Sequence, residues 1–149
     1  MRLSKRSEYG LRAAIQLAGS YRDGFLQTRE LSRREDLPAK FLESILRSLK
    51  AAGYLASKVG ASGGYRLADR PQNIPVGALV RVLEGQLVNP ALLEAPADPA
   101  NAGCGQIALH LLACRVENAL GSLIDSISLA DLRDQAIQAQ GESRAMFYI

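Results

Sequence analysis

Three glycines, Gly60, Gly63 and Gly64, fall within five residues in the first half of the chain. The segments on either side, YLASKV (54–59) and YRLA (65–68), have the β-favouring residues of short strands. Glycine accepts the backbone conformations that tight turns need, so the pattern predicts a β-hairpin. A phosphate-binding loop does not fit, because G-x-x-x-x-G-K-[ST] is missing from the sequence and no helix opens directly after the glycines.

The strongest helical pattern stands directly before this hairpin, over residues 38–52. Pro38 suits its first turn, and Gly53 stands where a C-terminal cap is expected. One face of this predicted helix is apolar and consists of Phe41, Leu42, Ile45, Leu46 and Leu49.

Two further helices are predicted upstream. Apolar residues recur at helical spacing over residues 5–20, and RDG (22–24) ends that pattern. A short helix is expected over residues 29–35, with Thr28 as its N-cap and Leu31 pointing inward. A helix, a helix-turn-helix and then a hairpin is the order of a winged helix, so the predicted fold is mainly α with a small β wing.

A winged helix places its hairpin close to nucleic acid. The small residues of the predicted wing can approach a phosphate backbone, and Lys58 and Arg66 flank the loop with positive charge. Charge is distributed to match: residues 1–70 hold 14 Lys and Arg against 7 Asp and Glu, a balance of +7, whereas residues 71–149 have a balance of −4. The basic half is therefore expected to face a polyanion.

Composition excludes other classes of protein. The chain is 48% hydrophobic and 22% charged, as in soluble globular proteins. No uninterrupted apolar run approaches the roughly 18 residues of a membrane span, and MRLSKRSEYG lacks the apolar stretch of a signal peptide. A cytoplasmic protein that does not enter the membrane is expected.

Three stretches carry a family resemblance: MRLSKRSEYGLRAAIQLA, LPAKFLESILRSLKAAGYLASKVGASGGYRLA and NIPVGALVRVLEG. They cover about residues 1–85, and SISLADL (126–132) is a weaker match. The sequence resembles the Rrf2 family of bacterial transcription regulators, which includes iron–sulfur-cluster and nitric-oxide sensors. The resemblance implies a homodimer that binds operator DNA through a winged helix-turn-helix domain at residues 1–84.

Within that resemblance, the face of helix 38–52 opposite its leucines is expected to read DNA, with Arg47 bonding guanine and Glu43 accepting from a cytosine amine. The alternative is that these two side chains, four residues apart, only pair with each other. Cations at the start of the first helix are expected to contact phosphates. The full predicted DNA-binding set is Arg2, Lys5, Arg6, Thr28, Lys40, Glu43, Ser44, Arg47, Lys58, Gly60, Ser62, Gly63, Gly64, Tyr65 and Arg66.

The C-terminal part, residues 105–149, is predicted to supply the dimer contact and a tail. A helix over about 105–125 has apolar residues at gaps of three and four: Leu109, Leu112, Val116, Leu120 and Leu123, with Ile127 beyond. A two-fold mate would bury this seam and space two wings for successive major grooves. SLAD (128–131) resembles the cap of a last short helix, and the GESRAMFYI tail is left unassigned.

Residues 85–104 contain three prolines and no periodicity, which predicts a long loop of the functional or disordered kind. The resemblance implies a sensor here, commonly three cysteines that bind an iron–sulfur cluster. This sequence departs from that pattern, because it has only Cys104 and Cys114.

A metal site remains a candidate nevertheless. His110 and Cys114 are four residues apart on one helical face, and Cys104 precedes the helix, where amides favour a thiolate. In relatives a carboxylate near the partner's N-terminus completes the cluster, and Glu8 matches that position. The alternatives without a metal are that Cys114 is a small core residue, that His110 is a surface residue, and that Glu8 is a first-turn acid favoured by the helix dipole.

Three functional classes follow. The first is a DNA-binding regulator controlled by an iron–sulfur cluster or thiol redox state, and the second is a cofactor-free regulator controlled by a small molecule or a partner protein. An enzyme is disfavoured, because the sequence suggests no nucleophile–base pairing, contains a single histidine and lacks a nucleotide-binding motif.

Overall fold

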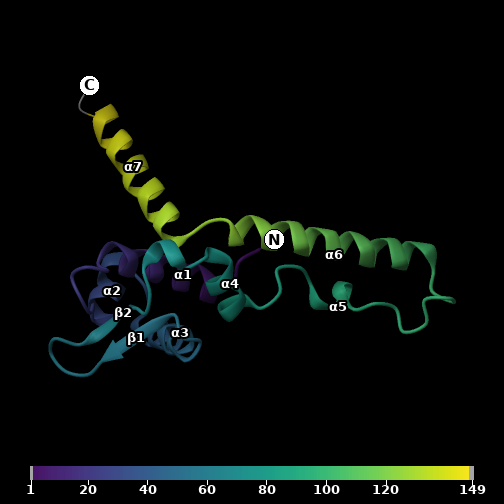
Figure 1. The fold of residues 1–149 in the computed structure, drawn as a ribbon, viewed down its shortest axis with the longest axis horizontal. Helices are drawn as coiled ribbons and strands as arrows, with labels where there is room; N and C mark the ends of the chain where they lie inside the picture. Colours follow the sequence, from purple (N-terminus) through teal and green to yellow (C-terminus); the bar gives the residue numbers. More distant parts are fainter. Residues whose placement is uncertain (1, 148–149) are drawn as a thin grey trace.

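The computed structural model describes residues 2–147, and Figure 1 shows a helical body from which two long helices extend. The body contains α1 (Lys5–Gly19), α2 (Thr28–Glu35), α3 (Ala39–Ala51), β1 (Leu55–Lys58), β2 (Gly64–Leu67), the 3-10 turn η1 (Pro71–Asn73) and α4 (Val76–Glu84). The remaining elements are the short α5 (Pro90–Leu93) and the long helices α6 (Cys104–Asp125) and α7 (Leu129–Phe147). The expected mainly α fold with a small β wing is confirmed.

The ends of α1 and α3 follow from local sequence signals. The Ser4 side chain accepts a hydrogen bond from the backbone N–H of Ser7 and caps α1. Gly53 has φ +87° after α3, and the N–H of Tyr54 donates to the carbonyl of Leu49 at 3.0 Å. These are features of a Schellman cap, which glycine favours because it has no Cβ.

One predicted cap is wrong. Gln27, not Thr28, occupies the N-cap of α2, because the Gln27 carbonyl already accepts from the N–H groups of Glu30 and Leu31. Thr28 is therefore the first helical residue, and the Gln27 side chain bonds to the backbone of Ala61 instead of capping the helix. Leu31 is fully buried, as predicted.

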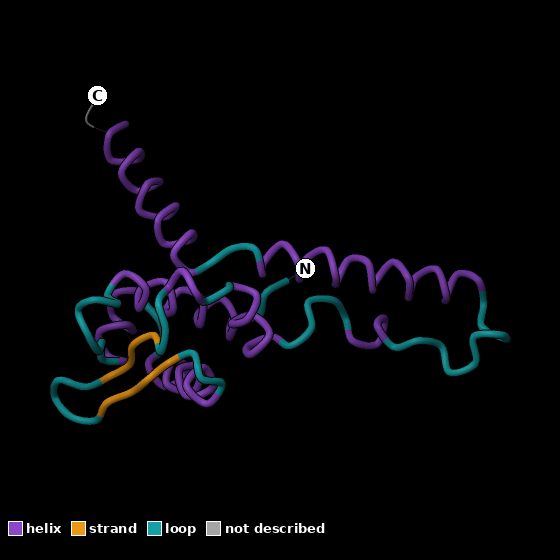
Figure 2. The backbone as a smooth tube through the Cα atoms, in the orientation of Figure 1, coloured by secondary structure: helices purple, strands orange, loops and turns teal. Residues whose placement is uncertain are grey.

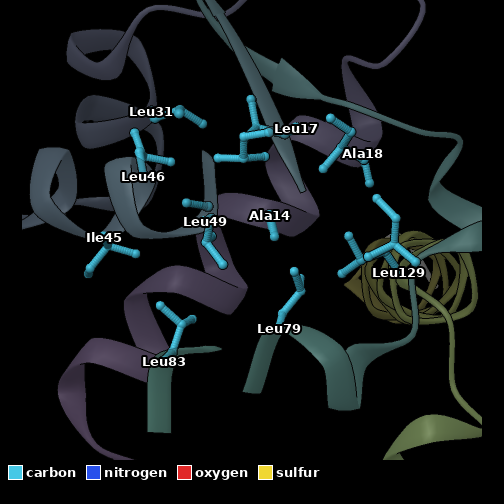
Figure 3. Packing of buried hydrophobic residues seen from close by; sticks show 14 of the residues in the cluster. Ala14, Leu17, Ala18, Leu31, Ile45, Leu46, Leu49, Leu79, Leu83 and Leu129 are labelled. Atoms are coloured by element: carbon cyan, nitrogen blue, oxygen red, sulfur yellow. The ribbon is translucent and has the colours of Figure 1, made fainter. Parts of the chain in front are cut away.

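The core forms where α1, α2, α3, α4 and the first turn of α7 meet, and Figure 3 shows their side chains converging. On α3 the predicted face is confirmed for Leu42, Ile45, Leu46 and Leu49, each 0% exposed. Phe41 is the exception, with 38% exposure. Its ring lies at the edge of the face and packs edge-on against Tyr9, with 5.7 Å between ring centroids.

Helix α4 is not among the elements that the sequence predicts, because Pro75 and Gly77 stand at its start and its segment VGALVRVLE is mostly apolar. It packs against α1 and α3. Its first residue, Val76, and the nearby Ile74 hold the start of α7, since Val76 N–H donates to Ile127 O at 2.8 Å and Leu129 N–H to Ile74 O at 2.9 Å. Backbone pairing thus fixes the α6–α7 connection to the body.

The C-terminal half differs from the prediction in the 85–104 loop, at the start of α6 and in the length of α7. The 85–104 loop contains α5, which lies beside α6, and Figure 2 shows long loops on either side of it. Helix α6 begins one residue early, so Cys104 lies in its first turn rather than before it.

Helix α7 is not short, because it spans 19 residues and takes in most of the tail. Reciprocal bonds start it: Ser128 N–H donates to the Asp131 carboxylate at 2.8 Å, and Asp131 N–H to the Ser128 hydroxyl at 3.1 Å. The last two tail residues, 148–149, lie outside the described residues.

Candidate nucleic-acid interface

The solvent face of α3 carries the predicted base-reading residues. Lys40, Glu43, Ser44 and Arg47 are all exposed, on the side of the helix opposite the buried leucines. Arg47 Nη2 lies 3.9 Å from Glu43 Oε2, and the two side chains are 75% and 52% exposed. That distance is too long for a hydrogen bond, so the pair leaves both groups able to bind another partner.

Arg6 reaches from α1 to α3. Its Nη1 donates to the Ser44 hydroxyl at 3.3 Å, and its Nη2 donates to the Ser48 hydroxyl. The structure therefore brings Arg6 and Ser44 together, a contact that spacing along one helix could not indicate. Lys5 instead pairs with Glu8 at 2.8 Å, and Arg2 is exposed.

The wing is an antiparallel hairpin in which Lys58 pairs with Gly64 and Leu55 with Leu67. Gly63 N–H donates to Gly60 O at 3.0 Å and closes the turn. Side chains at the tip point to solvent, with Val59 97% exposed. The predicted wing residues divide by exposure: Lys58, Gly60, Ser62 and Arg66 are exposed, Gly64 and Tyr65 are half-buried, and Gly63 is buried.

Three residues that sequence reasoning missed hold this wing in place. Leu26 pairs with Tyr65 like a third strand, through N···O distances of 2.8 and 2.9 Å. Gln27 Nε2 donates to Ala61 O at 2.6 Å. The guanidinium of Arg66 lies 4.7 Å from the centroid of the Phe25 ring, a cation–π contact. The segment FLQT therefore joins the wing to the start of α2.

Two arginines of α2 pair with an acid, unlike Lys40 on α3 and Lys58 on the wing. Glu30 pairs with Arg33 at 2.8 Å and with Arg34 at 2.7 Å. Hydrogen bonds from Arg33 and then Arg34 lower the pKa of Glu30 to about 2. Within residues 2–147, Lys40 and Lys58 form no ion pair. Thr28, at the start of α2, is half-buried.

Of the four candidate metal ligands, the structure brings together two. Cys114 Sγ lies 3.8 Å from both ring nitrogens of His110, whose Nδ1 is 3.1 Å from Leu92 O. Cys104 is exposed ten positions earlier, about 15 Å along the helix axis. Glu8 lies on α1, where Lys5 and Arg12 pair with it and its pKa is lowered, chiefly by the hydrogen bond from Lys5.

Across residues 2–147 no three His, Cys, Asp or Glu side chains are grouped closely enough to hold a metal ion. The donor set of a single chain therefore does not fit an iron–sulfur cluster, which prefers thiolate ligands.

Comparison with known proteins identifies the family. Residues 3–135 match the Rrf2 family model, described as iron-dependent transcriptional regulators. Protein rrf2 of Nitratidesulfovibrio vulgaris is 33% identical over 91% of this chain and 89% of its own length. The HTH-type transcriptional regulator CymR of Bacillus subtilis is 33% identical over the full length of both chains.

A solved structure agrees with these matches. The IscR protein of T. potens superposes with a TM-score of 0.76 and 30% identity, over 94% of this chain and 91% of its own. Shared family, shared fold and relatives named as regulators lead to one conclusion: the chain belongs to the Rrf2 family and is a DNA-binding transcriptional regulator, not an enzyme.

Proposed function

We propose that the protein binds operator DNA as a homodimer in the cytoplasm, with α3 in the major groove and the wing on the adjacent backbone. The observation that carries the proposal is the exposed polar face of α3, next to a wing whose cations, Lys58 and Arg66, form no ion pair within residues 2–147. Arg6, bonded to α3, adds positive charge beside the same face. Arg2, Lys5 and Thr28 are assigned to flanking phosphates.

The dimer contact is assigned to α6. Four of its exposed apolar residues form one stripe: Leu109 (47% exposed), Leu112 (57%), Val116 (40%) and Leu123 (58%). By length and composition alone α6 could also cross a membrane, with a mean hydropathy of 1.3 over the best window. Its polar residues Arg115, Asn118 and Ser122 lie on another side, which also carries the exposed Leu111 (55%). The polar residues interrupt the apolar surface there, so the continuous stripe is the part that suits a second copy of α6.

Operator binding is expected to weaken steeply with salt, because several phosphates are neutralised by Lys and Arg. A dimer with about six to ten phosphate contacts loses roughly 10³–10⁵ in affinity between 50 and 200 mM salt. Titrations of labelled duplexes at several salt concentrations measure this slope. Binding that is indifferent to salt would exclude the proposed interface.

Within that interface, Arg47→Ala is expected to cost about 1–3 kcal/mol on the preferred site and to relax discrimination at one base pair. Lys58→Ala serves as the matched control, since a phosphate contact weakens all sequences about equally. Binding to a randomised duplex library gives both specificity profiles. Identical profiles for wild type and Arg47→Ala would remove the base-contact assignment and leave Arg47 paired with Glu43.

For sensing, we favour control without a resident cluster over an iron–sulfur cluster, because one chain supplies only two thiols that lie about 15 Å apart along α6. Protein reconstituted anaerobically with iron and sulfide is then expected to remain colourless and free of stoichiometric iron. Absorbance and metal analysis test this. Iron and sulfide in proportion to dimer, lost in both Cys104→Ala and Cys114→Ala, would instead support a cluster completed by the partner chain.

A further inference from the structure

A cavity of about 670 Å³ opens at the base of α7. Its walls come from the last turn of α1, the chain that follows α1, the segment around η1, and α7. Polar and aromatic side chains line it: Tyr21, Arg22, Asp23, Arg70, Gln72 and Arg133. Its volume falls in the range of about 300–1,000 Å³ that is usual for small-molecule sites.

Three arginines from segments far apart in the sequence meet at this cavity, whereas only one acid, Asp23, lines it. The side-chain charge of the lining is therefore +2. Within residues 2–147, the guanidinium groups of Arg22 and Arg70 form neither an ion pair nor a hydrogen bond. Some other arginines of the body pair with acids, as Arg12 does with Glu35 at 3.0 Å. Asp134 pairs with Arg133 at 2.8 Å, so the positive charge at the cavity that is left without an ion pair is that of Arg22 and Arg70.

One of the three arginines is held in position. Arg133 is 26% exposed, its Nη1 donates to Ala18 O at 3.2 Å, and its Nε donates to Asp134 Oδ1 at 2.8 Å. The half-buried Tyr21 and the buried Pro71 also line the cavity. Gln72 adds an amide that both donates and accepts.

We propose that this cavity binds a small dianion, a phosphate ester or a dicarboxylate. Guanidinium groups bind both anions through paired N–H···O bonds, and two such groups without internal partners match two negative charges. A phosphate of the operator is the competing source of the same chemistry. The position of the cavity argues against it, because no α3 or wing-tip residue lines the cavity, and Figure 1 shows α7 leaving the body on the side away from α3 and the wing.

The test is a titration of the full-length protein, without DNA, followed by backbone amide resonances. Inorganic phosphate and succinate are the two probes, and urea is the uncharged control. Saturable shifts are expected at the amides of residues 21–23, 70, 72 and 133 with at least one of the two anions, and none with urea. Whichever anion binds more tightly shows whether the site prefers phosphoryl or carboxylate groups.

Arg70→Gln is the informative variant, because its exposed side chain makes no bond whose loss would unfold the protein. It is expected to weaken anion binding about tenfold, as loss of a charge-assisted pair does. Arg115→Gln removes the same charge from α6, outside the cavity, and is expected to leave anion binding unchanged. Shifts that do not saturate, or that Arg70→Gln leaves intact, would overturn the proposal.

Operator binding separates the two sources of phosphate. If neither anion binds, and Arg70→Gln reduces the slope of log affinity against log salt concentration for DNA by about one, Arg70 is a DNA contact. The small-ligand assignment is then wrong. The anion titration contains no DNA, so a failure to bind either anion does not contradict the proposed operator contacts. In the same way, a failure to bind operator DNA does not affect the result of the anion titration.

Discussion

Gly64→Val is expected to lower the free energy of unfolding by about 2–5 kcal/mol and to weaken operator binding by at least tenfold. Gly64 has φ +127°, a conformation that valine adopts only under strain. A Cβ here would also lie 2.2 Å from Leu26 O and 2.8 Å from Gln27 N. Those backbone atoms cannot retreat freely, because Leu26 exchanges two hydrogen bonds with Tyr65.

Gly60→Val is the matched control for this prediction. Gly60 also has positive φ, at +111°, but a Cβ there meets nothing within 4 Å. Valine at this position then lowers the free energy of unfolding only through the strain of its backbone conformation, by about 1–2 kcal/mol. Chemical denaturation and DNA titration of both variants measure the difference. Equal losses in the two would show that conformation alone requires glycine, and an unaffected Gly64→Val would show that the wing tolerates detachment from Leu26.

The elements predicted correctly are those encoded by local pattern. The leucines of α3, its glycine cap and the glycine-rich hairpin lie within about 30 consecutive residues, so periodicity and turn chemistry suffice to place them. The polar face of α3 follows from the same helix. For this reason the candidate interface could be located from sequence, even though its contacts could not.

What was missed depends on contacts between distant segments. Leu26 joins the wing only because Tyr65, 39 positions later, folds back beside it. Arg6 reaches Ser44 because α1 crosses α3, and neither helix carries a signal for that crossing. Periodicity also cannot tell how wide a buried stripe is, which explains why Phe41 was assigned to the core although it stays 38% exposed.

The α6 seam shows the same limit. The predicted seam includes Leu120 because it falls at helical spacing, yet Leu120 is half-buried within the protomer. Ile127 lies beyond the end of α6 and packs against the core. The sequence locates an apolar helix face, but tertiary packing decides which part of it remains for a partner.

Leu112→Glu is expected to convert the proposed dimer into monomers and to reduce operator affinity by two or more orders of magnitude, since one protomer then holds one half-site. Leu112 is 57% exposed in the protomer, so the carboxylate stays solvated in the monomer and the fold should keep its stability. In the proposed dimer the same change removes a leucine from each protomer. Association buries only the exposed part of that leucine, so each loss costs less than the roughly 1.5–3 kcal/mol of complete burial. The substitution also places a charge in an apolar contact, which adds to the cost of association.

Asn118→Glu introduces the same charge on another side of α6, where the residue is already polar and exposed. This control should remain dimeric and bind operator nearly as wild type does. Sedimentation equilibrium gives the dimer dissociation constants, and thermal unfolding of both variants confirms that the protomer is intact. A Leu112→Glu protein that stays dimeric would place the contact elsewhere. A fully monomeric variant with undiminished operator affinity would keep α6 as the interface and show that a single winged domain accounts for DNA binding.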